Sequence, residues 1–431
     1  MIAYLRRFFP DTHPFRLFYH RIMAVLAAFV YWFPADRLKV IAVTGTHGKT
    51  TTTNLIAHIL EISGEKVGLS STICFKIGKK KWTNLSKQTT VSPFQLQKLL
   101  RNMVNAGCTY AVIETSSHAM TQSRLWGVNV DMAVLTNIGR DHIEYHGSFR
   151  TYVEAKLQLF SLLMTSRRKP NISKISVLNR ESEAFEYFNS FVPDRVITYG
   201  FTQKADYRVE NLEVEADSSR FIFKIPNDEI SIHLKIPGTF NVWNALAAAT
   251  ASLACGVKLP IIKNALESAR SFPGRLESID EGQNFAVIVD YAHTTESLEE
   301  LLRMFRKLVS GRIFIVFGAT GGGRDKAKRP KMGQVAHKYS DCIILTNDDP
   351  YDEDEHDIIE QIAHGIPRKE GENFWKIIDR KEAIRSAISL AKKGDVVIIA
   401  GKGCEEFMML KGKKVPHDDR RVAREILRAL K

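Results

Sequence analysis

The chain has 431 residues, 44% of them hydrophobic and 25% charged, so it is long enough for two or three globular domains. Its net charge is +13, but the lysines and arginines are scattered and no zinc-finger spacing or aromatic-basic module accompanies them. We therefore expect phosphorylated ligands and no nucleic acid. Five widely spaced cysteines without a C-x-x-C pair argue against a disulfide framework and a zinc site, and without an evident secretory signal they indicate a cytoplasmic protein.

We take residues 1–38 as a separate N-terminal segment that is both apolar and basic. It contains an uninterrupted apolar run of twelve residues, Ile22 to Phe33, closed by Pro34. That run is too short to span a bilayer, which needs about 20 residues. Two interpretations remain: burial against the next domain, which we prefer, and peripheral contact with an anionic membrane, with Tyr31 and Trp32 at the headgroups. The basic residues that would meet the lipid are Arg6, Arg7, Arg16 and Arg21.

The stretch Lys39 to Thr53, KVIAVTGTHGKTTTT, predicts a site for a nucleoside triphosphate. Val40 to Val43 is typical of a buried strand, two glycines follow it, and a helix is expected to begin at Lys49. In that geometry backbone N–H groups, the helix N-terminus and Lys49 attract phosphate, while Thr50 can offer a hydroxyl to Mg²⁺. The spacing is not that of the common P-loop, because Val43 stands where G-x-x-x-x-G-K-[ST] has its first glycine.

Beyond this loop, apolar strands alternate with helices, which predicts an α/β domain with a mostly parallel sheet over residues 39–271. Residues 196–236 differ, because their short alternating strands predict an antiparallel excursion, and an alanine-rich helix follows them. The other expected elements are helices at Thr51–Ser63, from Pro93 with Ser92 as its N-cap, and at Ser148–Leu163, and strands at Lys66–Ser71, Tyr110–Ile113 and Met132–Leu135.

The pattern restarts near residue 272, which predicts a second α/β domain over residues 272–431. Its strands are expected at Phe285–Val289, Ile313–Phe317, Cys342–Leu345 and Val396–Ala400. The predicted fold class is therefore α/β: a central P-loop ATPase domain with a mostly parallel sheet, followed by a Rossmann-like C-terminal domain.

Unusual polar residues stand at four predicted strand ends, where open α/β sheets bind their ligands. Glu114 ends one strand, His142 follows another, Asp290 and His293 end a third, and residues 347–349 end a fourth. Any one of them could simply cap a helix. Four together beside a phosphate loop favour Mg²⁺-assisted phosphoryl transfer, which needs hard oxygen ligands and cationic clamps.

Longer motifs sharpen this prediction through a resemblance. The loop TGTHGKTTT resembles the ATP loop of the Mur ligases and of the related folylpolyglutamate synthases. Seven further motifs match the Mur ligases in order, namely ETSSHAM, TNIGRDHIEYHGSFRTYVEAKLQLF, PGTFNVWNALAA, FPGRLESI, VDYAHTTESLE, FGATGGGRDKAKRP and AGKGCE. They are most similar to the branch that adds the third peptide residue to UDP-N-acetylmuramoyl-L-alanyl-D-glutamate. The resemblance runs from about residue 40 to the end.

What the resemblance implies is an ATP-dependent ligase of peptidoglycan synthesis. It would join a free amino acid, of the lysine or diaminopimelate class, to a UDP-muramoyl-peptide-like acceptor through an acyl phosphate. The residues expected to act in catalysis are Lys49, His142, Lys156 and Arg275. Those expected to bind Mg²⁺ are Thr50, Glu114, His142 and Lys156.

The resemblance places a carbamylated lysine at Lys156, whose alternative is an unmodified surface lysine. ATP is expected at Gly45, Thr46, His47, Gly48, Lys49, Thr50, Thr51, Asn241, Asn244, Arg275, Asp290 and His293. The acceptor and the amino acid are expected at Thr89, Thr90, Ser116, Arg124, Arg324, Asp348, Asp349, Gly401 and Glu405.

Two features depart from the family. Tyr351 stands where the family's D-N-P-R motif has the arginine that pairs with the distal carboxylate of diaminopimelate, so that bidentate recognition is lost. The acidic run over residues 348–354 would suit a cationic side chain such as lysine, unless it is a solvated loop. In addition, only 38 residues precede the ATP domain, where the family carries a domain that binds uridine diphosphate. Either that moiety is held differently, or a partner supplies the surface, or the substrate is not the usual one.

Three other functions remain open. A folylpolyglutamate synthase would share the loop and Lys156, but the motifs TSSHAM, DYAHTTES and RDKAKRP argue against it. A P-loop kinase or simple ATPase would not need the arginines of the C-terminal domain. A non-catalytic scaffold would be expected to have lost Lys49, Glu114 or His142, and all three are present.

Overall fold

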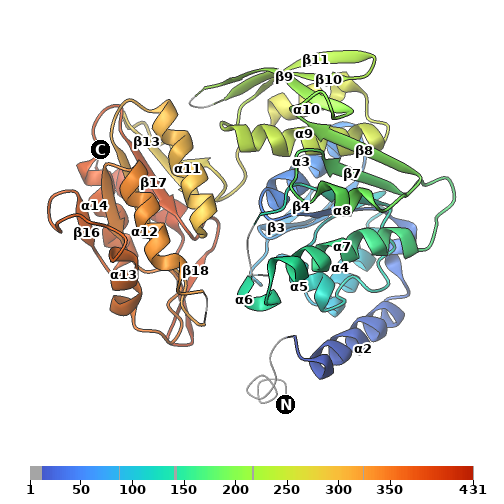
Figure 1. The fold of residues 1–431 in the computed structure, drawn as a ribbon, viewed down its shortest axis with the longest axis horizontal. Helices are drawn as coiled ribbons and strands as arrows, with labels where there is room; N and C mark the ends of the chain where they lie inside the picture. Colours follow the sequence, from blue (N-terminus) through green and yellow to red (C-terminus); the bar gives the residue numbers. More distant parts are fainter. Residues whose placement is uncertain (1–11, 87, 140–142, 216–217, 324, 431) are drawn as a thin grey trace. The chain divides into compact units, whose positions relative to one another are not determined.

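The computed structural model of the chain describes residues 12–86, 88–139, 143–215, 218–323 and 325–430. The chain divides into two compact units, Met1–Ala269 and Arg270–Lys431. We call them the N-terminal unit, blue to yellow-green in Figure 1, and the C-terminal unit, which runs from yellow-orange to red. Both units are α/β, as the sequence predicts.

The N-terminal unit is built on an 11-stranded sheet in which β1 lies between β5 and β6. Both neighbours pair with β1 in parallel, so the residues that follow these three strands lie together at the carboxyl ends of the strands. The strand order is β11-β10-β9-β8-β7-β6-β1-β5-β2-β3-β4, which leaves β11 and β4 at the two outer edges. The strands are β1 (Lys39–Thr44), β2 (Val67–Ser70), β3 (Cys74–Ile77), β4 (Lys80–Thr83), β5 (Tyr110–Glu114), β6 (Met132–Leu135), β7 (Ile175–Asn179), β8 (Arg195–Gly200), β9 (Tyr207–Val214), β10 (Ser219–Ile225) and β11 (Asp228–Leu234).

Helices cover both faces of this sheet (Figure 1). α3, α9 and α10 pack together on one face, and α4, α7 and α8 lie over the other. Val40 and Ala42 of β1 belong to the core beneath α4 and α7, because alternate residues of a strand point to opposite faces. The helices are α3 (Lys49–Ile62), α4 (Pro93–Asn105), α5 (Ser117–Thr121), α6 (Ile143–His146), α7 (Phe149–Thr165), α8 (Phe185–Asn189), α9 (Thr239–Ala254) and α10 (Leu259–Ser268).

The predicted elements of this unit are confirmed with two corrections. The range 196–236 is not wholly antiparallel, because β8 pairs in parallel with β7, and only β9, β10 and β11 form an antiparallel extension of the same sheet. The helix from Pro93 begins as predicted, but the Ser92 side chain makes no capping bond to its backbone. The Ser92 hydroxyl instead donates to Gln95 Oε1 at 3.1 Å.

Helix α2 (Pro14–Val30) precedes the sheet and packs on α4 through its smallest side chains. Ala24, Ala27 and Ala28 are buried. Gly127 permits the close approach, since a Cβ there would lie 2.6 Å from the Ala28 Cβ. Beyond α2, a short 3₁₀ helix (Pro34–Arg37) leads into β1. In the part of the chain that the structure describes, no helix is long and apolar enough to cross a membrane.

The large apolar side chains of α2 are exposed on the opposite face. The preferred expectation, burial of the run from residue 22 to 33, is therefore wrong for those side chains and correct for the alanines. At the closest point of this contact, opposite Gly127, there is room for the methyl group of Ala28 but not for a larger side chain at that position. The exposed residues are Phe15, Phe18, Tyr19, Ile22, Leu26, Phe29 and Val30, followed by Trp32.

The C-terminal unit has a six-stranded sheet in the order β12-β13-β17-β14-β15-β16, parallel except for the edge strand β12. β17 comes last of these six strands in the sequence but lies between β13 and β14 in the sheet. The segments that follow β13 and β17 are therefore neighbours. The four predicted strands are confirmed. The strands are β12 (Glu277–Ser278), β13 (Ala286–Asp290), β14 (Ile313–Phe317), β15 (Cys342–Leu345), β16 (Phe374–Lys376) and β17 (Val396–Ala400), with a separate hairpin of β18 (Phe407–Leu410) and β19 (Lys413–Pro416).

The helices of this unit also lie on two faces. α14 and α15 pack with the sheet into one apolar core, and α11, α12 and α13 pack against one another. Their bounds are α11 (Thr295–Leu308), α12 (Lys328–Tyr339), α13 (Glu355–Ala363), α14 (Arg380–Leu390) and α15 (Asp419–Ala429).

Candidate active site

The glycine-rich loop between β1 and α3 is shaped by two close contacts. A Cβ on Gly45 would lie 1.9 Å from Thr136 Oγ1, and a Cβ on Gly48 would lie 2.1 Å from Asn244 Oδ1. Both glycines also have positive φ. The carbonyl of His47 accepts from Thr136 Oγ1 at 2.7 Å, which fastens the loop to the segment after β6. The loop therefore meets the N-terminus of α3 in a fixed form, the arrangement that binds phosphate through backbone N–H groups.

Lys49, the first residue of α3, lies against this loop. Its Nζ donates to the carbonyl oxygens of Gly45 at 3.0 Å and Thr46 at 2.7 Å. These bonds hold a full positive charge at the loop, where the helix N-terminus already favours an anion. Thr51, also predicted to bind ATP, is buried in the first turn of the same helix.

Glu114, at the end of β5, is 1% exposed and accepts three hydrogen bonds. Its Oε1 accepts from the hydroxyls of Thr50 and Thr72, each at 2.9 Å, and its Oε2 accepts from the Thr72 N–H at 2.7 Å. Glu114 is the register partner of Val43 on β1, and this places its carboxylate beside the start of α3. The structure thus brings together Thr50 and Glu114, two of the predicted Mg²⁺ ligands.

The residues predicted to hold the acceptor gather at the same strand end. Thr90 Oγ1 donates to the Glu114 carbonyl at 2.9 Å and accepts from the Ser116 N–H at 3.1 Å. Arg124 Nη1 donates to the Thr90 carbonyl. Thr89 Oγ1 is 3.2 Å from the hydroxyl of Thr72. All four predicted residues of this segment therefore lie around the end of β5.

Lys156, on α7, is buried with 1% exposure, so the alternative of a surface lysine is wrong. Its Nζ donates to the Gly45 carbonyl at 2.7 Å and lies 4.6 Å from the centroid of the Tyr152 ring. The Tyr152 hydroxyl is 2.8 Å from Thr46 Oγ1. α7 therefore reaches the phosphate loop through two side chains one turn apart.

The two asparagines of α9 are buried beside α3. Asn244 Oδ1 accepts from the Thr52 hydroxyl at 3.4 Å, and Asn244 Nδ2 donates to Asn241 Oδ1 at 3.3 Å. Asn241 Nδ2 donates to the Pro237 carbonyl at 2.8 Å. Asn244 packs against Gly48 of the loop, and Asn241 is bonded to Asn244. Their predicted contact with adenine stays a prediction.

His142 lies outside the described residues, and its predicted role stays a prediction. A neighbouring cluster was not singled out from the sequence. His146 Nε2 is 3.0 Å from Ser117 Oγ, and the rings of His118 and Tyr145 lie with their centroids 3.9 Å apart. These residues belong to two of the quoted motifs, TSSHAM and IEYHG, so the signal was present, but the sequence does not show that the motifs meet.

In the C-terminal unit three quoted motifs meet at the ends of β13 and β17. Gly274 has a φ of +64°, and a Cβ there would lie 2.0 Å from the Cys404 backbone nitrogen, so the FPGR segment touches the AGKGCE segment. The Arg275 guanidinium lies 4.5 Å from the centroid of the Tyr291 ring. His293 Nδ1 is 2.8 Å from the Tyr291 carbonyl.

Asp290 uses its carboxylate to hold the loop that carries Arg275. Its Oδ2 accepts from the Leu276 N–H and its Oδ1 from the Ala292 N–H, both at 2.8 Å. Desolvation raises the pKa of Asp290, against the attraction of the neighbouring Arg275. Asp290 therefore orients Arg275, a use that the sequence did not indicate.

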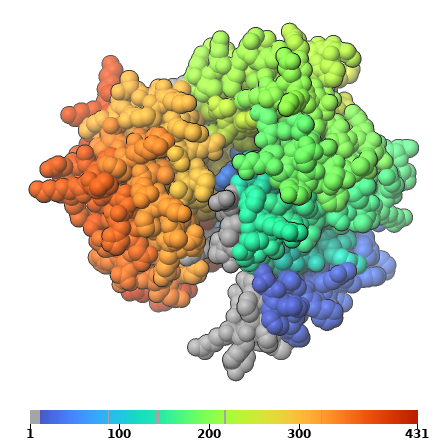
Figure 2. Space-filling view, viewed as in Figure 1, coloured from blue at the N-terminus to red at the C-terminus, as the bar shows by residue number. Residues whose placement is uncertain are grey.

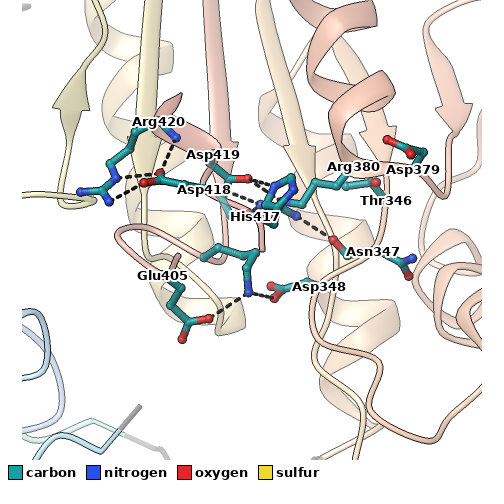
Figure 3. Close-up of polar contacts among 12 residues, drawn as sticks. Thr346, Asn347, Asp348, Asp379, Arg380, Glu405, His417, Asp418, Asp419 and Arg420 are labelled. Atoms are coloured by element: carbon teal, nitrogen blue, oxygen red, sulfur yellow. Dashed lines mark hydrogen bonds and ion pairs between the residues drawn. The ribbon is translucent and has the colours of Figure 1, made fainter. Parts of the chain in front are cut away.

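The acidic residues after β15 are neutralised by the chain itself. Lys402 is fully buried, and its Nζ lies 3.1 Å from Asp349 Oδ1, 2.9 Å from Glu405 Oε2 and 3.9 Å from Asp348 Oδ1. Two of these carboxylates, Asp348 and Glu405, are labelled in Figure 3. Burial by itself lowers the pKa of Lys402, but the three carboxylates together raise it. Gly401 is packed beside the same group, because a Cβ on it would lie 2.4 Å from Asp348 Oδ2.

A second buried pair supports this cluster from behind. Arg380 and Asp419 are both fully buried and form two hydrogen bonds of 2.8 Å. Arg380 also donates to the Asn347 carbonyl at 2.9 Å, just before Asp348 (Figure 3). His417 Nε2 is 2.8 Å from the same carboxylate. Burial opposes ionisation of Asp419, but the Arg380 guanidinium and His417 hold its pKa well below the ordinary range.

Two further members of the acidic run, Glu353 and Asp354, are also engaged. Glu353 Oε2 accepts from Arg329 Nη1 at 3.1 Å, and Arg329 is fully buried. Asp354 is the N-cap of α13. The interpretation of the run as a binding surface for a cationic ligand therefore needs correction, since these carboxylates have intramolecular partners. Arg324 lies outside the described residues, and the buried arginine of its motif, Arg329, was not singled out from the sequence.

Comparison with known proteins decides the family. The chain is 41% identical over 406 residues to the UDP-N-acetylmuramoyl-L-alanyl-D-glutamate--2,6-diaminopimelate ligase of Geobacillus kaustophilus, covering 94% of this chain and 82% of the relative. It is also 41% identical over 418 residues to the UDP-N-acetylmuramyl-tripeptide synthetase of a Roseiflexus species, covering 95% of this chain and 82% of the relative. This chain belongs to the Mur ligase family. The family models match in order: Mur ligase middle domain at residues 43–252, and Mur ligase, glutamate ligase domain, at residues 274–403.

Solved structures agree with the Mur ligase fold. A structure of UDP-N-acetylmuramoyl-L-alanyl-D-glutamate--2,6-diaminopimelate ligase is 32% identical with a TM-score of 0.64, and the match covers 91% of this chain and 79% of that one. Folylpolyglutamate synthase from Mycobacterium tuberculosis has a TM-score of 0.71 at 15% identity, with 95% and 94% covered. That second likeness shows a shared fold and no more.

The donors present in this Mur ligase fit a hard divalent cation. The Thr50 hydroxyl and the Glu114 carboxylate are buried oxygen donors beside a phosphate loop, which is the ligand type that Mg²⁺ prefers. Among the described residues, no three His, Cys, Asp or Glu side chains form a group that could hold a metal ion on their own. A site that is completed by phosphate oxygens and water is consistent with this donor set.

Proposed function

We propose that this Mur ligase joins an amino acid to the carboxylate of a UDP-N-acetylmuramoyl-L-alanyl-D-glutamate-like acceptor at the expense of ATP. One observation carries the proposal: the buried Glu114 and Thr50 lie side by side behind a glycine-rich loop that carries Lys49. The identity of 41% to a diaminopimelate ligase and to a tripeptide synthetase supports the class of acceptor.

In the proposed reaction, the loop N–H groups and Lys49 bind the phosphates of ATP. The acceptor carboxylate attacks the γ-phosphorus, the bond from that phosphorus to the oxygen that bridges the β- and γ-phosphates breaks, and ADP leaves. Groups that are already in position stabilise the developing negative charge. When bound at Thr50 and Glu114, Mg²⁺ would neutralise phosphate oxygens. Arg275 is the further phosphate cation that the family resemblance implies. Lys49 must exchange its bonds to the Gly45 and Thr46 carbonyls for bonds to phosphate.

The acyl phosphate is then consumed by the amino acid. Its amine attacks the acyl carbon, a tetrahedral intermediate forms, and the bond from that carbon to the phosphate oxygen breaks to release phosphate. The acceptor is proposed to lie along Thr89, Thr90, Ser116 and Arg124, because these residues gather at the end of β5 beside Glu114.

For the amino acid, we propose a substrate with a second ammonium group, of the lysine or diaminopimelate class. The relatives at 41% identity, a 2,6-diaminopimelate ligase and a tripeptide synthetase, support this class, whereas the carboxylates of Asp348, Asp349 and Glu405 are already engaged by Lys402. Tyr351 has no charge with which to pair the distal carboxylate of diaminopimelate. The tyrosine in place of the family's arginine therefore favours lysine over diaminopimelate.

The test is phosphate release from ATP with UDP-N-acetylmuramoyl-L-alanyl-D-glutamate and a panel that includes lysine, diaminopimelate and alanine. Release that requires both the acceptor and a diamino acid is expected, with the tripeptide product confirmed by mass. Lys49→Ala is expected to abolish it, whereas Lys79→Ala, at an exposed lysine of the same unit, is the matched control and should retain full activity. Release driven by a folate and glutamate instead would overturn the proposal in favour of a folylpolyglutamate synthase, and release without any amine acceptor would indicate a simple ATPase.

A further inference from the structure

Helix α2 presents an apolar face that the described fold leaves exposed. Phe18 is 62% exposed, Phe29 60% and Trp32, just beyond the helix, 82%. A soluble monomer rarely exposes a contiguous apolar patch of this kind without using it. Figure 2 shows this segment, in blue, at the surface of the N-terminal unit.

The exposed side chains form a single stripe. At about 3.6 residues per turn, the exposed apolar residues from Phe15 to Val30 fall within about a third of the helix circumference. By the same geometry, Arg16 borders the stripe on one side and Arg21 on the other. An apolar stripe with basic residues along its borders is typical of a helix that lies in the interface of a bilayer.

The stripe is held in place by the rest of the unit. Its opposite face is buried through Ala24, Ala27 and Ala28. At the C-terminal end, Arg101 Nη2 donates to the carbonyls of Tyr31 at 2.6 Å and Trp32 at 3.0 Å. The helix is therefore ordered before it meets any partner, so binding would not have to fold it.

We propose that this face binds the surface of an anionic lipid bilayer, with α2 lying in the plane of the membrane. The charge of the segment selects this partner. Residues 1–38 contain five arginines and two acidic residues, Asp11 and Asp36, and α2 itself contains no acidic residue. An anionic surface attracts such a segment, whereas a second copy of the same helix would bring arginines together.

The same geometry sets the depth of binding. The phenylalanine, leucine and isoleucine side chains of the stripe enter the boundary of the acyl chains, about 5–10 Å deep. Tyr19 and Trp32, with their polar ring atoms, lie at the level of the headgroups. The ATP-binding unit would stay in water, attached through its N-terminal helix.

Co-sedimentation of the full-length protein with vesicles tests the proposal. Phosphatidylglycerol vesicles are expected to retain the protein at low salt, and phosphatidylcholine vesicles are expected to retain much less. Each of Arg16→Gln and Arg21→Gln should lower the partition coefficient about fivefold. Added salt should also lower the partition coefficient of the wild type, because it screens the attraction to the anionic lipid. Phe18→Asp combined with Leu26→Asp should lower the partition coefficient more than tenfold, because two apolar side chains that the bilayer would bury are lost.

Tyr187→Asp with Val192→Asp is the matched control, since these are exposed apolar residues elsewhere on the same unit, and it should bind nearly as well as the wild type. In case the α2 variant unfolds, wild-type fluorescence gives a second measurement. Lipids brominated on the acyl chain near the headgroup should quench Trp32, and Trp32→Phe should remove most of that quenching.

Three outcomes would overturn the proposal. One is wild-type protein that does not sediment with phosphatidylglycerol vesicles at low salt. Another is equal retention on phosphatidylcholine, which would remove the anionic partner. The third is self-association in sedimentation velocity that the α2 variant abolishes while vesicle binding stays absent, which would identify a second copy as the partner.

Discussion

Gly48 is one residue whose missing methyl group decides the geometry of the phosphate loop. Its φ is +77°, and a Cβ would lie 2.1 Å from Asn244 Oδ1. We expect Gly48→Ala to lower the free energy of unfolding by about 2–4 kcal/mol, through backbone strain and overcrowding together. The KM for ATP should rise as well, because α9 must move away from the loop. Chemical denaturation and steady-state kinetics measure the two effects.

Gly107→Ala is the control for that variant. Gly107 also has a positive φ of +75°, but a Cβ there meets no atom within 4 Å. Its replacement should cost only the backbone strain, about 1–2 kcal/mol. Adding Asn244→Ala to Gly48→Ala removes the obstructing atom and should restore part of the stability. Equal losses at both glycines would contradict the steric account.

Substitution of Lys156 tests whether a carbamate on this lysine is part of the site. Its amine is buried and bonded to the Gly45 carbonyl, so Lys156→Ala removes a contact to the phosphate loop. We expect phosphate release to fall by about 10–100-fold. If the side chain acts as a carbamate, millimolar acetate or formate should recover part of the activity. Lys98→Ala, at an exposed lysine, should lose nothing. Loss without recovery would contradict the carbamate and leave the amine itself as the functional group.

Among the elements, α2 should respond in opposite ways on its two faces. Ala28 is buried against Gly127, so Ala28→Leu should lower the free energy of unfolding by about 1–3 kcal/mol. Leu26→Ala, on the exposed face, should change it by less than about 0.5 kcal/mol. Thermal unfolding of the two variants measures the difference. Comparable losses at both positions would mean that the exposed face packs on the protein in solution.

The loop between β15 and α13 should lose a specific support in acid. Burial opposes ionisation of Glu353, but its hydrogen bonds to Arg329, the Gly323 N–H and Lys326 lower its pKa to about 2. A carboxyl with a lowered pKa stabilises the fold above its ordinary pKa, 4.5, and this contribution is lost as the pH falls towards about 2. Glu353→Gln should therefore cost about 2–3 kcal/mol at neutral pH.

The difference between wild type and Glu353→Gln should shrink steadily between pH 4.5 and about 2, and urea unfolding over that range measures it. Glu372→Gln, at an exposed glutamate of the same unit, is the matched control and should show no such trend. A difference that stays constant with pH would show that Glu353 acts through shape and not through charge.

For the whole molecule, the division into two compact units predicts unfolding in two steps. The phosphate loop belongs to the N-terminal unit, so a non-hydrolysable ATP analogue should raise the transition of that unit. At about 100 times its Kd, the ligand adds about 2.7 kcal/mol, which corresponds to several degrees. Calorimetry with and without the analogue measures the shift, and Lys49→Ala should abolish it. A shift that survives in Lys49→Ala would place nucleotide binding elsewhere.

Most of the architecture could be predicted, because parallel strands leave local apolar patterns. β6, β14, β15 and β17 have the predicted bounds. The part of the site that could be predicted is formed by residues that are neighbours in the sequence, as in the loop that carries Lys49. Side-chain contacts between segments that are far apart in the sequence could not be predicted. Nothing local to Lys402 or Arg380 indicates that each is buried among carboxylates, and nothing near Ala28 indicates that α2 would bury its alanines and expose its aromatic side chains.

The position of β4 at the outer edge of the large sheet has a consequence for solubility. An edge strand offers unpaired backbone groups to any other strand, and proteins often guard such edges with lysine. In this chain Lys79 lies in the turn before β4, Lys80 and Lys81 begin that strand, and all three side chains are exposed. Charge repulsion between copies would therefore oppose the addition of a further strand, and these lysines protect the protein from aggregation.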